Sequence, residues 1–223
     1  MKRAFAALPM LISCSAALGA GGRPMTTDDA ALTNARSCQL ETWLQHARGD
    51  AQLWLLPACN PTGDFEFSAG AVVDHPQGDA TFTGSLLQFK TQWLHGRPLA
   101  GFTAGALREH GSWNLYYAYL PITTSLTPTT QVHVNLGWQH DRSAREDQMT
   151  YAVALAHDLD APFNVFAEIF GTDDTPPIAQ AGGAVLFRGG VMQIDGSIGR
   201  PLRGTLRDFV YSIGFEFYPD ALW

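Results

Sequence analysis

After its first 21 residues, the sequence has no apolar run long enough to cross a membrane as a helix. Such a helix needs about 20 consecutive apolar residues, and Gly, Pro or a charged residue interrupts every candidate. No apolar repeat with a period of 3.6 residues persists there either. The main part of the chain is therefore either soluble or crosses a membrane as strands.

Positive charge is also scarce. The chain has 14 Lys and Arg against 21 Asp and Glu, a net charge of -7, and its lysines are Lys2 and Lys90. A nucleic-acid partner requires a basic patch, so we exclude this class of partner. A solvated acidic surface and a cation-favouring lumen both agree with the charge.

The N-terminus has the layout of a cleaved secretory signal peptide. Lys2 and Arg3 precede an apolar run over residues 4–17, and small residues follow as far as Gly21. We therefore expect residues 1–21 to be removed on export, which moves the net charge from -7 to -9 because two positive charges are lost. A lipid-attachment box ending at Cys14 is the alternative.

The two cysteines left after cleavage, Cys38 and Cys59, are predicted to form a disulfide, since the exported chain meets an oxidising compartment. A hairpin folded at Arg48-Gly49 places Cys38 opposite Cys59 and Trp43 opposite Trp54. Directly opposed residues come within disulfide range. Two free thiols are the alternative.

Residues 209–217 alternate large apolar side chains with small or polar ones, the pattern of a strand with one apolar and one polar face. The same alternation is clear in 64–73 and 131–139, and it is weak in the Gly- and Ala-rich stretches 98–108 and 178–187. Twelve strands are predicted in all, near residues 37–46, 51–58, 63–73, 80–94, 98–108, 112–120, 130–140, 148–157, 162–170, 178–187, 190–198 and 206–218.

Twelve strands with an aromatic strand last predict an all-β fold, an antiparallel transmembrane β-barrel over residues 37–223. Bacterial barrels have an even number of strands, which places both termini in the periplasm. Residues 22–36 are then expected to be an irregular periplasmic lead-in. A soluble sandwich explains the alternation equally well, but it explains the terminal aromatic strand and the strand count less well.

Aromatic residues near the predicted strand ends indicate girdles at the two membrane interfaces. In a soluble protein the same residues would fill a core. They are Trp43, Trp54, Trp93, Trp113, Tyr116, Tyr117, Tyr119 and Trp138.

If the apolar faces meet lipid, the polar faces line the lumen. Lys90 is the one lysine left after cleavage, and we expect it to join an ion-pair network with the carboxylates around it. Such a network either plugs a lumen of this size or gives it selectivity. The predicted lumen-lining residues are Glu66, Lys90, His133, Asn135, Glu168, Asp195 and Glu216.

Catalytic and metal-binding patterns are missing from the sequence. A hydrolase at the membrane rim needs a Ser with a His base and an orienting group, and no Ser lies two residues from a His in a predicted strand. No His, Cys or Asp cluster has metal-ligand spacing. We therefore predict no catalytic residue, no metal and no cofactor, with a rim-located lipid-modifying enzyme as the alternative.

Three short motifs resemble the opening of proteobacterial outer-membrane proteins: Thr27-Asp28-Asp29-Ala30, Cys38-Gln39-Leu40-Glu41 and Pro57-Ala58-Cys59-Asn60-Pro61-Thr62-Gly63. The chain is thereby similar to the transporter family named for the MetA pathway of phenol degradation, most clearly over residues 25–75. The resemblance implies an outer-membrane β-barrel that passes small compounds, hydrophobic ones included. The chain departs from the usual barrel ending because Pro219-Asp220 interrupts the alternation before Trp223.

These features together predict a passive channel or transporter for small molecules in the outer membrane of a Gram-negative bacterium, without enzymatic activity. Its expected partners are outer-membrane lipid, the barrel-assembly machinery and a small-molecule solute. The sequence leaves the oligomeric state open. A structural barrel with a plugged lumen is the other alternative.

Overall fold

The computed structural model describes residues 23–47, 50–74, 80–159, 162–204, 208–219 and 222. Within these ranges the chain forms twelve strands and one short 3-10 turn, Arg188–Gly190. The strands are β1 (Ser37–Ala47), β2 (Asp50–Asn60), β3 (Phe65–Asp74), β4 (Thr81–Leu94), β5 (Leu99–Glu109), β6 (Ser112–Thr127), β7 (Thr130–Asp141), β8 (Glu146–Asp158), β9 (Phe163–Thr172), β10 (Ile178–Phe187), β11 (Met192–Pro201) and β12 (Val210–Phe217).

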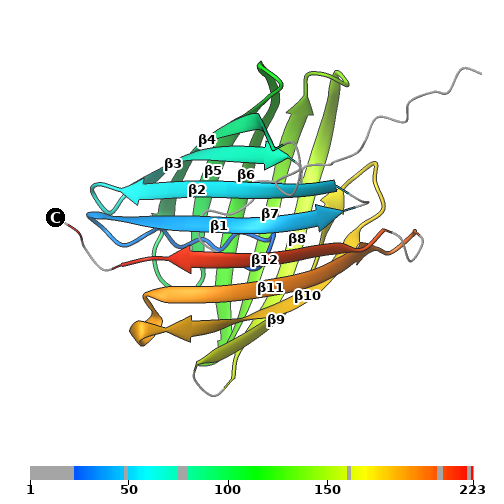
Figure 1. Ribbon diagram of the computed structural model, residues 1–223. Coiled ribbons are helices and arrows are strands. Elements are labelled where there is room, and N and C mark those ends of the chain that lie inside the picture. Colours follow the sequence, from blue (N-terminus) through cyan, green and yellow to red (C-terminus); the bar gives the residue numbers. More distant parts are fainter. Residues whose placement is uncertain are drawn as a thin grey trace, which may run out of the picture.

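Each strand pairs antiparallel with its neighbours in sequence, and β12 pairs with β1 to close the sheet into a barrel (Figure 1). The predicted fold class is therefore confirmed, and the alternative of a soluble sandwich is wrong. We call the end where β1 begins, near Ser37, the base of the barrel. The opposite end, which carries the turn between β7 and β8, is the rim.

The two faces of the strands differ as the alternation predicts. On β12, Tyr211 and Ile213 are 47% and 60% exposed, whereas Glu216 is 6% exposed. Leu136 on β7 also lies on the outer face, at 55%. A continuous outer band of large apolar side chains is typical of barrels that cross membranes. Among the described residues, no helix is long and apolar enough to span a membrane.

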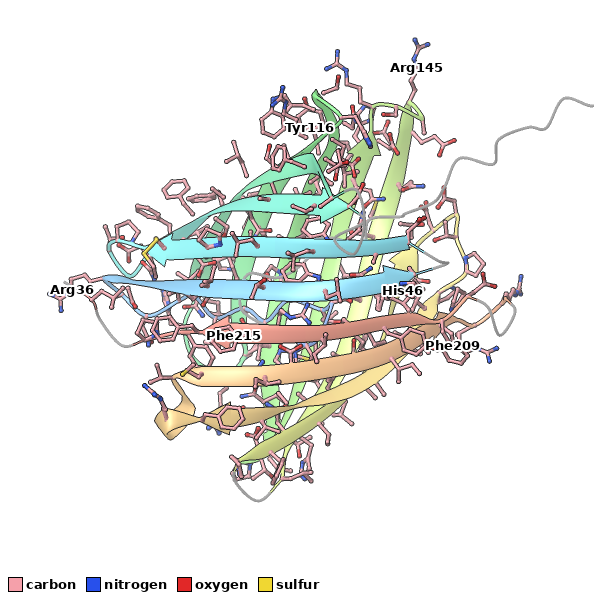
Figure 2. All side chains as sticks on the ribbon, in the orientation of Figure 1. Arg36, His46, Tyr116, Arg145, Phe209 and Phe215 are labelled. Carbon is pink, nitrogen blue, oxygen red and sulfur yellow. A yellow bond between two sulfur atoms is a disulfide. The ribbon has the colours of Figure 1, made fainter. Side chains whose placement is uncertain are left out.

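The hairpin of β1 and β2 has the predicted register. Cys38 lies opposite Cys59 and Trp43 opposite Trp54, and the two cysteines form a disulfide, seen as a yellow bond near the end of β2 in Figure 2. The predicted turn at residues 48–49 and the predicted signal peptide lie outside the described residues. The disulfide prediction is confirmed, and the alternative of two free thiols is wrong.

Strand β6 runs to Thr127, beyond the end predicted at residue 120. Pro121 follows that predicted end, and proline has no N–H for a sheet ladder. Pro121 does pair with Asn135 of β7. On the β5 side the ladder is interrupted between the pairs Ala100–Ile122 and Thr103–Tyr119. Pro121 lies within this interruption, so the N–H that it lacks is not needed for pairing with β5.

Part of the aromatic prediction is wrong. Trp93, Tyr116 and Trp138 are exposed, as girdle residues would be, but four of the others are buried inside the barrel. They belong to an apolar cluster that fills part of the interior between β1 and β6. Its members are Trp43, Trp54, Leu56, Ala58, Val72, Leu86, Leu107, Leu115, Tyr117 and Tyr119.

Candidate functional site

The interior of the barrel holds every residue that the sequence assigned to the lumen. The exposed fraction of these residues ranges from 0% to 6%, and they come from six different strands. They are Glu66 of β3, Lys90 of β4, His133 and Asn135 of β7, Glu168 of β9, Asp195 of β11 and Glu216 of β12.

The interior also holds a piece of chain that belongs to no strand. Residues 23–36, which we call the inner segment, run inside the barrel and reach its base at Arg36, labelled in Figure 2. Residues 22–36 were expected to lie in the periplasm ahead of the barrel. The structure corrects this for residues 23–36, because their polar groups bond to side chains of the lumen wall.

The carboxylate of Asp28 is the centre of these contacts. Lys90 Nζ lies 2.8 Å from its Oδ1, and Tyr119 Oη and Thr103 Oγ1 donate hydrogen bonds of 3.1 and 3.3 Å to its Oδ2. Lys90 Nζ also lies 3.5 Å from Asp29 Oδ1. Because Asp28, Lys90 and Thr103 are fully buried, the wall provides a closed receptor for one carboxylate.

The backbone of the inner segment is bound as well. The N–H of Asp28 donates to Asn135 Oδ1 at 2.7 Å, and Asn135 Nδ2 donates to the carbonyl of Asp28 at 2.8 Å. The N–H of Ala30 donates to Thr123 Oγ1 at 2.9 Å, and this hydroxyl also contacts His133 Nδ1 at 2.9 Å. Asn135 therefore lies at the inner segment rather than along an open path, whereas His133 contacts Thr123 and also lines the cavity between the inner segment and the wall.

Two wall carboxylates accept donors from the inner segment on either side of Asp28. Glu168 accepts from the N–H groups of Thr26 and Thr27, both at 2.8 Å, and from Thr27 Oγ1 at 2.7 Å. Glu66 accepts from the N–H of Thr33 at 2.8 Å and from Thr33 Oγ1 at 2.5 Å. These bonds give donors to both oxygens of Glu168 and to Oε2 of Glu66, and a carboxylate is costly to bury without donors.

Arg23 fixes the far end of the inner segment. Its Nη2 lies 2.7 Å from Asp195 Oδ1, and its guanidinium carbon lies 4.7 Å from the centre of the Trp43 ring. Trp43 in turn stacks on Trp54, with ring centres 5.4 Å apart and planes 3° apart. Arg23 thus joins the polar side of the lumen to the apolar cluster.

A cavity of about 290 Å³, which we call the vestibule, remains between the inner segment and the wall. Its lining includes Gln131, Asp158 and Asn164, which lie at the ends of β7, β8 and β9 that face the base. Tyr218, just beyond β12, also lines it. Partial burial and the charge of Glu216 raise the pKa of Tyr218 to about 12, so its hydroxyl stays protonated at neutral pH.

The sequence identified the charged wall residues but missed Thr103 and Thr123, assigned Tyr119 to a girdle, and missed the partners on the inner segment. Asp28 and Thr27 were noticed only as part of a motif, and Arg23 and Thr33 were not singled out. One signal was available: the predicted lumen had one cation for several carboxylates, and the neighbouring stretch 23–36 is rich in arginine and hydroxyl groups. In the described part of the chain, no three His, Cys, Asp or Glu residues are grouped as a metal site.

Three porins are among the solved structures that share this barrel. They are the KdgM porin in complex with disordered oligogalacturonate (10% identity, TM-score 0.65, 80% of this chain and 98% of that chain), the KdgM porin (14%, 0.63, 80% and 98%) and the NanC porin in a rhombohedral crystal form (9%, 0.62, 81% and 98%). At these identities the likeness is one of fold. No curated protein matches the sequence. Residues 8–215 match the family described as Uncharacterised conserved protein UCP029691, and the chain belongs to that family.

Proposed function

We propose that the protein is an outer-membrane channel for small molecules and that the structure is its closed state. The observation that carries the proposal is the barrel itself, which has an apolar outer band and a polar interior occupied by a segment outside the strand ladder. The shared fold of the KdgM and NanC porins supports it.

The proposal includes a location and partners. An exported chain with an even number of strands is expected in the outer membrane of a Gram-negative bacterium, inserted there by the barrel-assembly machinery and surrounded by lipid. Both termini, and therefore the base, then face the periplasm. We assign no enzymatic activity to the chain.

The class of solute follows from the charge and polarity of the interior. The wall carries the carboxylates Glu41, Glu66, Glu168, Asp195 and Glu216 against the single ammonium of Lys90. A polyanion such as the oligogalacturonate of the KdgM complex would be repelled. The apolar cluster and the resemblance to the MetA-pathway transporters support the passage of small, weakly charged compounds, hydrophobic ones among them.

A structural barrel with a permanently plugged lumen is the second candidate, because the inner segment occupies part of the lumen. Planar bilayer recordings of the purified full-length protein distinguish the two. We expect discrete current steps with a preference for cations, and we expect Asp158→Asn, at the vestibule, to lower that preference. Silent bilayers that contain inserted, heat-modifiable barrel would favour the structural role and overturn the channel.

A further inference from the structure

The wall groups that hold the inner segment have the composition of a binding site for a free molecule. We propose that residues 23–34 are an internal blocker, and that the site they occupy binds a short acidic peptide or a similar solute when the channel is open. This inference rests on the proposed channel function. It adds to the weakly charged compounds of that proposal a second class of solute, a peptide with one or two carboxylates of which one meets Lys90, and a polyanion remains excluded.

The first support is the receptor for the Asp28 carboxylate. Lys90, Thr103 and Tyr119 come from three adjacent strands, β4 to β6, and converge on that one group. All three are buried. Charge-assisted hydrogen bonds of this kind are the stronger ones in proteins. A solute that brings a carboxylate to this point can therefore replace the one that the inner segment supplies.

The second support is the way in which the wall binds the backbone. Asn135 pairs with both the N–H and the carbonyl of Asp28, as a neighbouring peptide group would. Glu168 and Glu66 each accept from a backbone N–H and a hydroxyl of the same threonine. These contacts do not depend on which chain supplies the peptide groups, so a separate peptide with the same donors can make them.

The third support is that the inner segment is not part of the barrel ladder. β1 closes on β12 without it, and the segment's backbone N–H groups at Thr26, Thr27, Asp28, Ala30 and Thr33 donate to side chains. Withdrawing the segment would therefore break no bond between strands. Water entering the lumen would form hydrogen bonds with the wall side chains that the segment had bound.

The inner segment is fastened at its C-terminal end. The N–H of Arg36 donates to the carbonyl of Asn60 at 2.7 Å, and Asn60 Nδ2 donates to the carbonyl of Thr33 at 2.7 Å. Arg36 has a positive φ of 56°, so the chain turns sharply there to enter β1. Movement of residues 23–34 about Arg36, with loss of the bond from Asn60 to Thr33, would open the lumen and leave the strands in place.

A reversible lock tests the blocker in the full-length protein. Ala30 N lies 2.9 Å from Thr123 Oγ1, so the pair Ala30→Cys with Thr123→Cys is the one chosen for the bridge, and loss of thiol labelling shows that the bridge has formed. We expect the oxidised variant to be silent in planar bilayers and the reduced one to conduct. The single variant Ala30→Cys, treated with the same reductant, controls for reduction of Cys38–Cys59. Heat-modifiable gel mobility shows that each variant is folded.

Free peptide tests the solute class. In the full-length Asp28→Asn variant, whose inner segment is held less tightly, a synthetic peptide of residues 25–34 should reduce the current. The same peptide with Asp28→Asn and Asp29→Asn should need a concentration at least about tenfold higher, since it lacks the charged group that Lys90 binds.

The outcomes separate the two proposals. If the oxidised pair conducts as well as the reduced one, the inner segment is not a blocker, although the channel function stands. If both peptides block equally, the solute class is wrong. If neither the wild type nor any folded variant conducts, the channel function itself fails.

Discussion

Lys90 Nζ lies 2.8 Å from Asp28 Oδ1, and neither side chain is accessible to solvent. The two residues are separated by 62 positions in the chain and belong to parts of the protein that pattern alone treats separately, an irregular leader and a central strand. Their pairing places the inner segment within the barrel and gives the most buried carboxylate of that segment its counter-ion.

Lys90→Gln should destabilise the barrel by about 3–5 kcal/mol, because it leaves a buried carboxylate without its cation. Asp28→Asn should cost less, since Lys90 keeps Asp29 at 3.5 Å and its cross-strand neighbour Glu66. The measurement is the free energy of unfolding from urea titrations in lipid vesicles.

The double variant Lys90→Gln with Asp28→Asn completes a double-mutant cycle, which measures the interaction energy between these two side chains. It should be more stable than Lys90→Gln alone, because the buried charge without a partner has been removed. Strictly additive effects would mean that the two side chains do not interact in the folded protein, and the placement of the inner segment would then be in question.

Trp43→Ala should destabilise the protein by about 3–5 kcal/mol, the usual cost of emptying a buried aromatic site. Trp43 is 6% exposed, stacks on Trp54 and lies under the guanidinium of Arg23. The near-ultraviolet circular dichroism of the stacked pair should disappear with it. Trp93→Ala is the matched control, because Trp93 is 54% exposed; an equal loss at both positions would contradict the interior packing.

Alternation along single strands was enough to predict much of this fold. An apolar outer face and polar groups inside impose a period of two on most strands, so the twelve strands and the inward faces could be predicted from local sequence. The β1–β2 register followed from one turn and two cysteines. The same face rule places Trp43 beside Glu41 on the inside. The assignment of Trp43 to a girdle used its position near a strand end, and this criterion predicted its location less well than the alternation did.

The weakly patterned strands have a physical explanation in their neighbours. Gly105 of β5 lies opposite Tyr117 of β6, and a Cβ at this glycine would collide with the tyrosine ring and hydroxyl. Gly182 of β10 lies opposite Phe166 of β9 with the same consequence. A large inward ring on one strand thus requires a glycine on the next, which removes the alternation from that strand.

The inner segment could not be predicted by such local reasoning. It has no strand period, and its position depends on partners far away in sequence, from Glu66 to Asp195. Only the excess of carboxylates in the predicted lumen hinted that donors had to come from elsewhere. A charge balance over the whole interior is therefore a useful test to add to strand patterning.

Replacing both Cys38 and Cys59 by Ala should lower stability by about 3 kcal/mol at most, the chain-entropy value for a loop of this length, whose ends are 21 residues apart. The register of β1 and β2 should survive, because their ladder continues to Ala47–Asp50. The measurement is the temperature at which the folded band is lost in heat-modifiable gels. If the unreduced wild type loses its folded band at the same temperature as the variant, the disulfide adds no stability.

The outer face is tested by an arginine at two depths of one strand. Leu136 lies midway along β7, exposed, between Leu120 of β6 and Tyr151 of β8, whereas Thr130 begins the strand. In lipid vesicles, Leu136→Arg should cost about 2–4 kcal/mol and Thr130→Arg about 0–1 kcal/mol, because the penalty for a charge is greatest at the bilayer midplane. Water around the barrel would make no such distinction, since an exposed arginine is solvated equally well at both positions. Equal and small losses in urea titrations would therefore mean that the apolar band does not face lipid.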